Sequence, residues 1–355
     1  MKIRNMFGIG LVCTMTLMMA GVADLWAADT KPLVLRFAEM SPPAGNQAFY
    51  LEKTCKEVEK ATEGRIKIEI YWSDTLVKNK EMPRALKDGI CDIAWVGGSN
   101  HPAEIPLWTI FTYFLYNPKG DDAAWLVRKG WEFFDNCEPM RKDFERLGQT
   151  AWFFIPYDSF ALYSKKAVKG LDDMKGMRIR IVGEGYMKML NAIGVHPQFI
   201  PASDLYPAME RGTVDGAITG WEMGKRYRFY EVVPYITDTA ITFALSSNNV
   251  ALAAVKKMSE KDRKIFFDIG RRMSIEYGDS EKNERANYKT FMQEKGLKIL
   301  PFPAQDREKW ANMPEVKGLV KSWVETQNRA GRPGTEVMKT FVKIFEMPAW
   351  MVEGL

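Results

Sequence analysis

Two arginines stand two residues apart in the stretch MKGMRIRIVG, which otherwise has the composition of a buried β-strand. Residues two apart on a strand point to the same face, so Arg178 and Arg180 share one face, about 6 to 7 Å apart along it. A glycine-flanked strand exit follows Arg180, which places this residue near the carboxyl end of its strand, where α/β proteins hold their ligands. Because the planar guanidinium group makes two parallel hydrogen bonds to a carboxylate, the pair indicates a site for an organic acid. A solvated basic face is the alternative.

The segments around the arginines alternate between strand and helix patterns. Strands are predicted over residues 33–39, 66–72, 93–96, 150–155, 160–164, 177–182 and 243–254. Helices are predicted over residues 47–62, 83–87, 122–147, 185–193, 203–211 and 260–296. Such alternation is typical of parallel sheets with crossover helices, and the pattern restarts near residue 155. The sequence therefore predicts two α/β units with a ligand cleft between them.

The bulk composition fits an exported globular protein of two domains. The chain has 355 residues, of which 46% are hydrophobic and 27% charged, and its net charge of +5 is spread without blocks of one sign. This bias is too weak to indicate a nucleic-acid partner, and we expect none. Lys2 and Arg4 precede an apolar run over residues 6–23, which predicts a signal peptide over residues 1–27 and export to the periplasm. An uncleaved membrane anchor is the alternative.

Neither the cysteines nor the histidines form a recognisable chemical motif. Cys55, Cys91 and Cys137 would remain after cleavage, and we expect buried free thiols, with one disulfide and one leftover thiol as the alternative. His101 and His196 have no partners at metal-ligand spacing, and both are expected on surface loops. Because nucleotide, serine-nucleophile and zinc-protease motifs are also missing, we expect no cofactor and no metal.

The segment over residues 171–220 resembles the signature region of the periplasmic solute-binding proteins of TRAP transporters, the DctP family. The motifs that carry the resemblance are DMKGMRIR (173–180), AIGVHP (192–197), DLYPAMERG (204–212) and VDG (214–216), in the order and spacing of that family. EGRI (63–66), ALKDG (85–89) and CDIA (91–94) extend it upstream. The resemblance implies an α/β, two-domain periplasmic-binding-protein-like fold, with a ligand cleft between the domains and a long connecting helix over residues 260–296.

The same resemblance implies the domain boundaries and the partners. Domain I is expected over residues 28–156 plus about 246–285, and domain II over residues 157–245 plus about 286–355, including the C-terminal helices. The expected partners are a small-molecule carboxylate and the small and large membrane subunits of a TRAP transporter. We expect a monomer that binds its ligand without breaking a bond and is not an enzyme.

In the DctP family the arginine that closes the K-I-R motif binds the ligand's carboxylate, so the resemblance assigns this role to Arg180 and leaves Arg178 peripheral. Phe160 stands where many members place a second arginine, and Thr219 stands where an asparagine is common. These departures favour a ligand with one carboxylate and an apolar or aromatic body. Aromatic residues at predicted strand ends add a pocket wall. The candidate ligand-binding residues are Arg180, Phe160, Trp221, Thr219, Trp95, Glu39 and Trp72.

Two other functions share this expected fold. A ligand-sensing component of a signalling system would differ only in its partner. An exported enzyme would need an acid–base pair in the cleft, for which the sequence offers the scattered carboxylates Glu39, Asp158 and Glu222.

Overall fold

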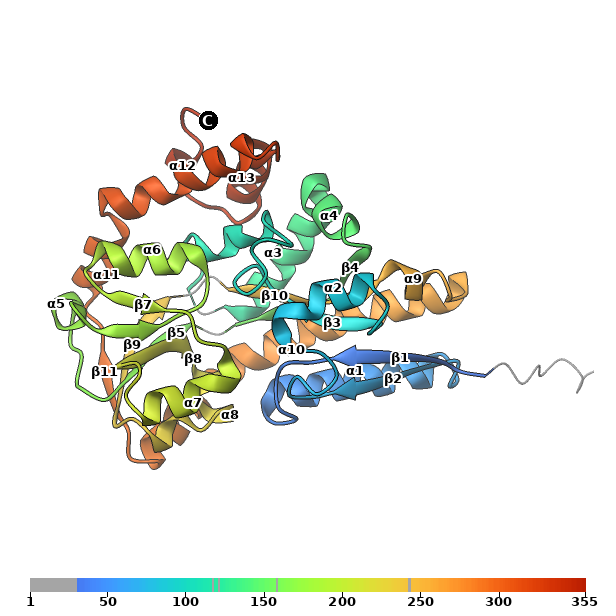
Figure 1. The fold of residues 1–355 in the computed structure, drawn as a ribbon, viewed down its shortest axis with the longest axis horizontal. Helices are drawn as coiled ribbons and strands as arrows, with labels where there is room; N and C mark the ends of the chain where they lie inside the picture. The colour runs from blue at the N-terminus through green and yellow to red at the C-terminus, as the bar shows by residue number, and fades with distance from the viewer. Residues whose placement is uncertain (1–30, 117, 121, 158, 242–243) are drawn as a thin grey trace, which may run out of the picture.

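Two β-sheets, each covered by helices, form the protein in the computed structural model (Figure 1). The structure describes residues 31–116, 118–120, 122–157, 159–241 and 244–355. The expected signal peptide over residues 1–27 lies outside these ranges. Within them, no helix is both long enough and apolar enough to cross a membrane.

The first sheet has the strand order β2-β1-β3-β10-β4. Its strands are β1 (Leu33–Ala38), β2 (Ile66–Tyr71), β3 (Ile93–Val96), β4 (Gln149–Pro156) and β10 (Leu245–Ala251). β1 pairs in parallel with β2 and β3, through the crossover helices α1 (Gly45–Ala61) and α2 (Met82–Lys87), as predicted. β10 returns from the other half of the chain and runs antiparallel to β3 and β4.

The region over residues 122–147, predicted as helical throughout, contains two helices, α3 (Ala123–Asn136) and α4 (Glu138–Glu145). Cys137 separates them with φ −112° and ψ 89°, outside the helical region. Pro139 lies in the first turn of α4, where its missing N–H costs no hydrogen bond. The first half of the chain also has short 3-10 segments at η2 (Asn79–Glu81) and η3 (Trp108–Thr112).

The second sheet has the order β11-β9-β5-β8-β6-β7. Its strands are β5 (Phe160–Ser164), β6 (Arg178–Arg180), β7 (His196–Gln198), β8 (Gly216–Gly220), β9 (Tyr235–Ile241) and β11 (Lys298–Pro301). The helices between them are α5 (Leu171–Met174), α6 (Glu184–Ala192), α7 (Ala202–Glu210), α8 (Trp221–Arg226) and the 3-10 segment η4 (Phe229–Glu231). β6 is shorter than predicted, but Arg180 is its last residue, so the side chain does stand at the carboxyl end of a strand that pairs in parallel with β7 and β8.

The chain passes three times between the sheets: from β4 to β5, from β9 back to β10, and along α10 (Glu260–Glu294) to β11. The predicted strand over residues 243–254 is β10 followed by the short helix α9 (Leu252–Val255). Phe266 and Tyr277 of α10 belong to the core of the first sheet, whereas Tyr288 and Met292 pack into a core of the second. The long connecting helix is therefore confirmed, and it joins both units.

The C-terminal helices are α11 (Ala304–Ala311), α12 (Pro314–Arg329), α13 (Gly334–Ile344) and the 3-10 segment η5 (Ala349–Met351). α12 packs on α6 of the second unit, but Trp323 of α12 and Phe341 of α13 lie in the core of the first sheet. The indole N–H of Trp323 donates to the Thr109 hydroxyl at 2.9 Å. α12 thus contacts both units and α13 packs on the first, whereas the sequence assigned the C-terminal helices to the second.

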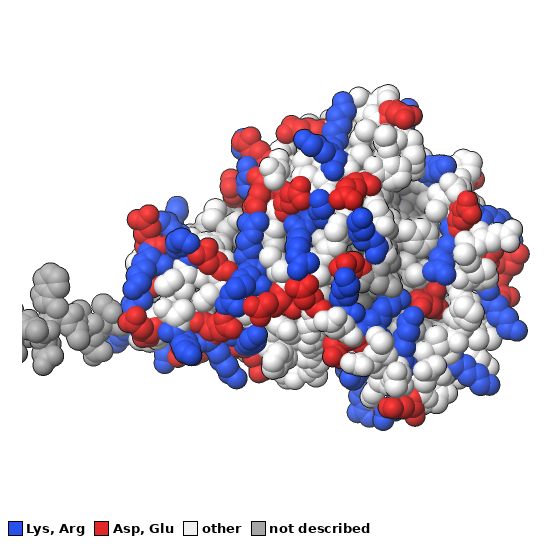
Figure 2. Space-filling view, turned by 180° about the vertical axis from the view of Figure 1, so that it is seen from behind, with Lys and Arg blue, Asp and Glu red and all other residues white. Residues whose placement is uncertain are grey.

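Lysine, arginine, aspartate and glutamate side chains alternate over the rear face of the molecule (Figure 2). Several form ion pairs between α10 and its neighbours, such as Lys53 with Glu276 at 3.0 Å and Arg128 with Asp279 at 2.9 Å. The three cysteines of the described residues, Cys55, Cys91 and Cys137, are buried free thiols, which confirms that prediction.

Candidate functional site

A partly enclosed cavity lies between the two sheets, at the ends of strands from both. The space within it that the centre of a water-sized sphere can reach is about 50 Å³, which is room for a few water molecules, so a small organic molecule requires the two units to move apart to admit it. The first unit contributes Met40 after β1, Trp95 on β3, Ser99 and Asn100 after β3, and Ser246 on β10. The second unit contributes Phe160, Arg180, Val182, Tyr186, Ile218, Thr219 and Met223. Tyr157 comes from the segment that crosses between them.

Arg180 is the cation of this cavity. Its residue is only 3% exposed, and its Nε donates to the Ile200 carbonyl at 2.8 Å. No carboxylate of the described residues lies within ion-pair distance of its guanidinium group. Burial lowers the pKa of Arg180 to about 10, which still leaves it protonated at neutral pH. A buried positive charge without a negative partner is costly, so this group is suited to meet an anion from outside the protein.

Arg178 has the opposite environment. It is exposed, and Asp215 accepts from its Nη2 at 2.8 Å and from its Nε at 3.2 Å. The Gly212 carbonyl accepts a further hydrogen bond at 2.8 Å. The strand therefore directs one arginine to the surface ion pair and the other to the cavity, and the peripheral position predicted for Arg178 agrees with this.

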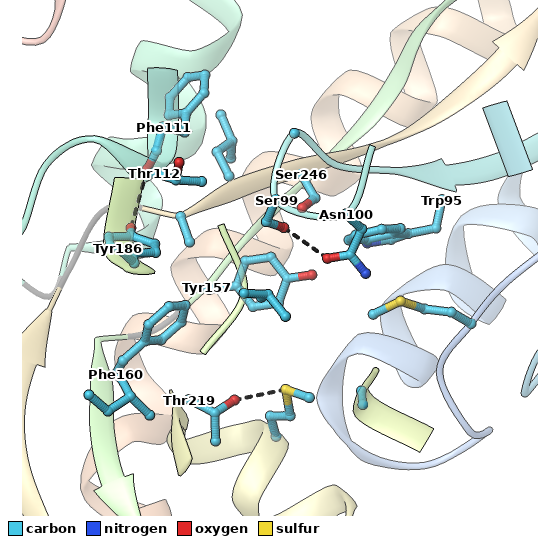
Figure 3. Close-up of a pocket in the computed structure, with 18 of the residues that line it drawn as sticks. Trp95, Ser99, Asn100, Phe111, Thr112, Tyr157, Phe160, Tyr186, Thr219 and Ser246 are labelled. Atoms are coloured by element: carbon cyan, nitrogen blue, oxygen red, sulfur yellow. Dashed lines mark hydrogen bonds between the residues drawn. The ribbon is translucent and has the colours of Figure 1, made fainter. Parts of the chain in front are cut away.

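Aromatic and polar groups divide the cavity wall. Phe160, Tyr186 and Phe111 form an apolar side, and Phe160 and Tyr186 lie edge to face with ring centroids 6.0 Å apart. In Figure 3 the Tyr157 hydroxyl points toward the side that carries Ser99, Asn100 and Ser246. Burial raises the pKa of this hydroxyl to about 12, so it is a neutral hydrogen-bonding group. The cavity thus offers one cation, aromatic walls and a small neutral polar edge.

The structure brings four of the seven candidate residues to the cavity: Arg180, Phe160, Thr219 and Trp95. The Thr219 hydroxyl donates to the Met223 sulfur at 2.9 Å, as Figure 3 shows. The three other candidates, Trp221, Glu39 and Trp72, lie outside the cavity lining.

Each of these three residues directly follows the end of a strand, but its side chain does not line the cavity. Trp221 opens α8 and packs edge to face on Tyr163 in a core of the second sheet. Trp72 lies partly buried against the core of the first sheet. Glu39 is fully buried beside the cavity residue Met40, and its Oε1 accepts from the Ser41 N–H at 3.0 Å. Of the carboxylates considered for an enzyme, Glu39 and Glu222 are outside the cavity lining, and Asp158 lies outside the described residues.

The prediction of a surface position for His101 is wrong. This residue is 1% exposed, because its ring holds together the loop after β3. Nδ1 accepts from the Gly97 N–H at 3.2 Å, so Nε2 carries the proton and donates to the Asn79 carbonyl at 2.7 Å. His196 is exposed as expected, although it lies on the edge strand β7 and not in a loop.

The sequence did not predict that Ser99, Asn100, Ser246 and Tyr186 would line the cavity. Ser99 and Asn100 follow Gly97-Gly98 directly after a predicted strand, and this position after a strand end is a signal for a ligand loop. Tyr186 lies in the first turn of the helix after Arg180, again close to a strand end. For Ser246, on the antiparallel strand β10, no local signal marks the position.

These features define a two-domain α/β protein of the periplasmic-binding-protein type, in which two sheets joined by several crossings enclose a ligand cavity; the predicted fold class is confirmed. A family model described as "Bacterial extracellular solute-binding protein, family 7" (DctP) matches residues 37–324. The chain belongs to this family, the solute-binding proteins of TRAP transporters, and the resemblance found in the sequence is confirmed.

Individual relatives agree with this assignment. A solute-binding protein of Chromohalobacter salexigens is 23% identical over 295 residues, covering 82% of this chain and 81% of the relative. A TRAP solute-binding protein of Rhodoferax ferrireducens, solved with copurified benzoate, has a TM-score of 0.78 at 21% identity and covers 88% of this chain and 97% of its own. DctP7 of Bordetella pertussis, an extracytoplasmic solute receptor that binds pyroglutamic acid, has a TM-score of 0.74 at 20% identity, over 87% and 99% of the two chains. At these identities the structural likeness shows the fold.

Proposed function

We propose that this protein binds a small monocarboxylate with an apolar or aromatic body in the cavity, and delivers it from the periplasm to the small and large membrane subunits of a TRAP transporter. The observation that carries the proposal is Arg180, a buried cation without a carboxylate partner among the described residues. The ligand's carboxylate would supply the missing charge, and exclusion of water would strengthen the ion pair.

The other residues of the cavity favour a ligand with one carboxylate over a ligand with two. Phe160, where many family members have a second arginine, adds an aromatic ring to the wall and no charge. The apolar side formed with Tyr186 and Phe111 suits a ring or a branched chain. Benzoate and pyroglutamic acid, the ligands of the two structural neighbours described above, each combine one carboxylate with a compact ring.

A thermal-shift screen tests the ligand class. We would compare benzoate, pyroglutamate and branched 2-oxo acids with the dicarboxylate succinate, since a ligand that binds only the folded protein raises its melting temperature. Monocarboxylates with a ring or branched body should give the largest increase. A shift confined to succinate would contradict the proposed ligand class.

Calorimetry on variants then tests the anchor. For the best acid of the screen, Arg180→Ala should lose about 2 to 5 kcal/mol of binding free energy, because the carboxylate would be buried without a partner. Arg180→Lys should recover only part of it, since an ammonium group cannot make two parallel hydrogen bonds. Arg178→Ala is the matched control from the same strand and should bind normally. Unchanged affinity in Arg180→Ala would exclude this anchor.

A further inference from the structure

A second buried arginine, Arg226, lies away from the cavity lining, where α8 of the second unit meets the amino-terminal end of α1 of the first (Figure 1). Its Nη1 donates to the Gln47 side-chain carbonyl on α1 at 2.7 Å. Its Nη2 lies 3.3 Å from Glu222 Oε2, one turn earlier on α8, and the two side chains are 2% and 8% exposed. This contact therefore places two nearly buried, oppositely charged side chains at a junction of the two units.

The amino-terminal end of α1 does not cap itself. Its N-cap residue is Ala44, which has no side-chain acceptor, and no acidic residue lies in the first turn. The first N–H groups of a helix have no partner within the helix, and the helix dipole makes this end attractive to negative charge. An end of this kind gains from a carboxylate supplied by another part of the protein.

Glu222 of α8 brings a carboxylate close to this end of α1, where its negative charge interacts favourably with the helix dipole. Gly45, the first residue of α1, has φ +80°, and a Cβ at this position would collide with Glu222 Oε1. The glycine therefore both allows the backbone conformation and lets the carboxylate approach the helix end. Glu222 and Arg226 bring opposite charges to α1, one at its end and the other at Gln47 in its first turn.

We infer that Glu222 and Arg226 form a latch between the two units, which sets the Glu222 carboxylate against the amino-terminal end of α1 and the Arg226 guanidinium on Gln47, and favours the closed arrangement without touching the ligand. The Glu222–Arg226 pair lies within α8 and can persist when the units separate, so opening removes only its contacts to α1. A groove lined by Asn46, Lys225 and Tyr288 adjoins the latch and gives water a path to it. The inference goes beyond the proposed ligand, because it concerns closure and holds for any ligand of the cavity.

Two substitutions at the start of α1, one in its first turn and one at its N-cap position, test the latch without unpairing a buried charge. Gln47→Ala removes the hydrogen bond from Arg226. Ala44→Ser gives α1 an N-cap of its own, since Ala44 is exposed and has the extended backbone (φ −147°, ψ 154°) of an N-cap residue. Ala44→Ser should raise the melting temperature or leave it unchanged while it weakens closure, whereas a merely structural role of this contact would lower stability and affinity together.

The readouts are the closed fraction and the rate of ligand release. Spin labels at the exposed Lys256 and Lys298, one in each unit, report the distance between the units in the ligand-free protein, and stopped-flow measurements report benzoate release. Both variants should reduce the closed fraction and speed release by about 3- to 10-fold, because in each variant closure gains less from the contact with α1. Glu284→Gln, in the same groove, is the control and should behave as wild type.

The distances between the spin labels are measured in the ligand-free protein, so this test does not depend on the proposed ligand class. If benzoate does not bind, the ligand assignment is affected, but these distances still show whether the latch favours the closed arrangement. A ligand-free protein without a closed fraction, or variants with wild-type distances and wild-type release, would overturn the inference.

Discussion

Arg180 and Arg226 are both buried arginines of the second unit, but among the described residues only Arg226 has a carboxylate partner. Arg226 has the Glu222 carboxylate and the Gln47 carbonyl within reach. Arg180 has one backbone carbonyl, from Ile200, and no carboxylate among the described residues. Although burial by itself lowers the pKa of Arg226, the charge of Glu222 and the nearby tyrosines hold it above its ordinary value, whereas burial lowers the pKa of Arg180 to about 10.

The difference separates a structural cation, Arg226, from the proposed binding cation, Arg180. Burial alone does not identify a ligand anchor, because Arg226 is as inaccessible as Arg180. The distinguishing property is an unmet electrostatic requirement next to empty space, and of these two residues only Arg180 lines the cavity. Arg178, with its exposed partner Asp215, shows the third possibility, a surface ion pair of small energetic weight.

The largest effect on stability should come from breaking the Arg226 pair. Arg226→Met leaves the buried Glu222 carboxylate without its cation, and we expect the free energy of unfolding to fall by about 3 to 5 kcal/mol in urea denaturation. Arg178→Met, the same change in the exposed pair with Asp215, is the control and should cost at most about 1 kcal/mol. Equal losses in the two variants would remove the distinction between these pairs.

The next effect concerns Glu39, a buried carboxyl on which the charge of Arg226 acts. Burial raises the pKa of Glu39 to about 7, against the hydrogen bond from the Ser41 N–H and the attraction of Arg226. Between pH 4.5 and 7 the folded protein therefore holds a proton that the unfolded chain has lost, so stability falls as the pH rises through this window.

Glu39→Gln should abolish this fall, because an amide keeps the Ser41 hydrogen bond and carries no charge. We expect the variant to exceed wild type by about 3 kcal/mol at pH 8 and to match it near pH 4.5, in urea unfolding followed across pH. A stability difference independent of pH would mean that Glu39 does not titrate in this way.

The smallest effect should come from Arg180→Met, which we expect to raise the free energy of unfolding, whereas Arg226→Met lowers it. In the ligand-free protein, Arg180→Met removes a buried charge that lacks a counterion, and we expect the free energy of unfolding to rise by about 1 to 2 kcal/mol. The same variant should not bind the acid that stabilises wild type. A loss of stability would show that Arg180 is satisfied by the protein itself.

The sequence predicted those features that depend on local pattern. Alternating strands and helices gave the two units, and the position of Arg180 at a strand end placed it at the cavity. Glu39 and Trp221 also stand at strand ends but point elsewhere, because the rotation of a side chain at a strand exit depends on the packing around it. The contact of Arg226 with Gln47 joins residues 179 positions apart, and no local pattern indicates such a pairing.

α10 has a further consequence for how this protein loses its structure. At 35 residues it is about 52 Å long, and it contributes side chains to the cores of both sheets. Melting either sheet would strip packing from the helix on which the other sheet also depends. Heat or denaturant should therefore disrupt both halves together, in one cooperative transition, even though each half has its own sheet.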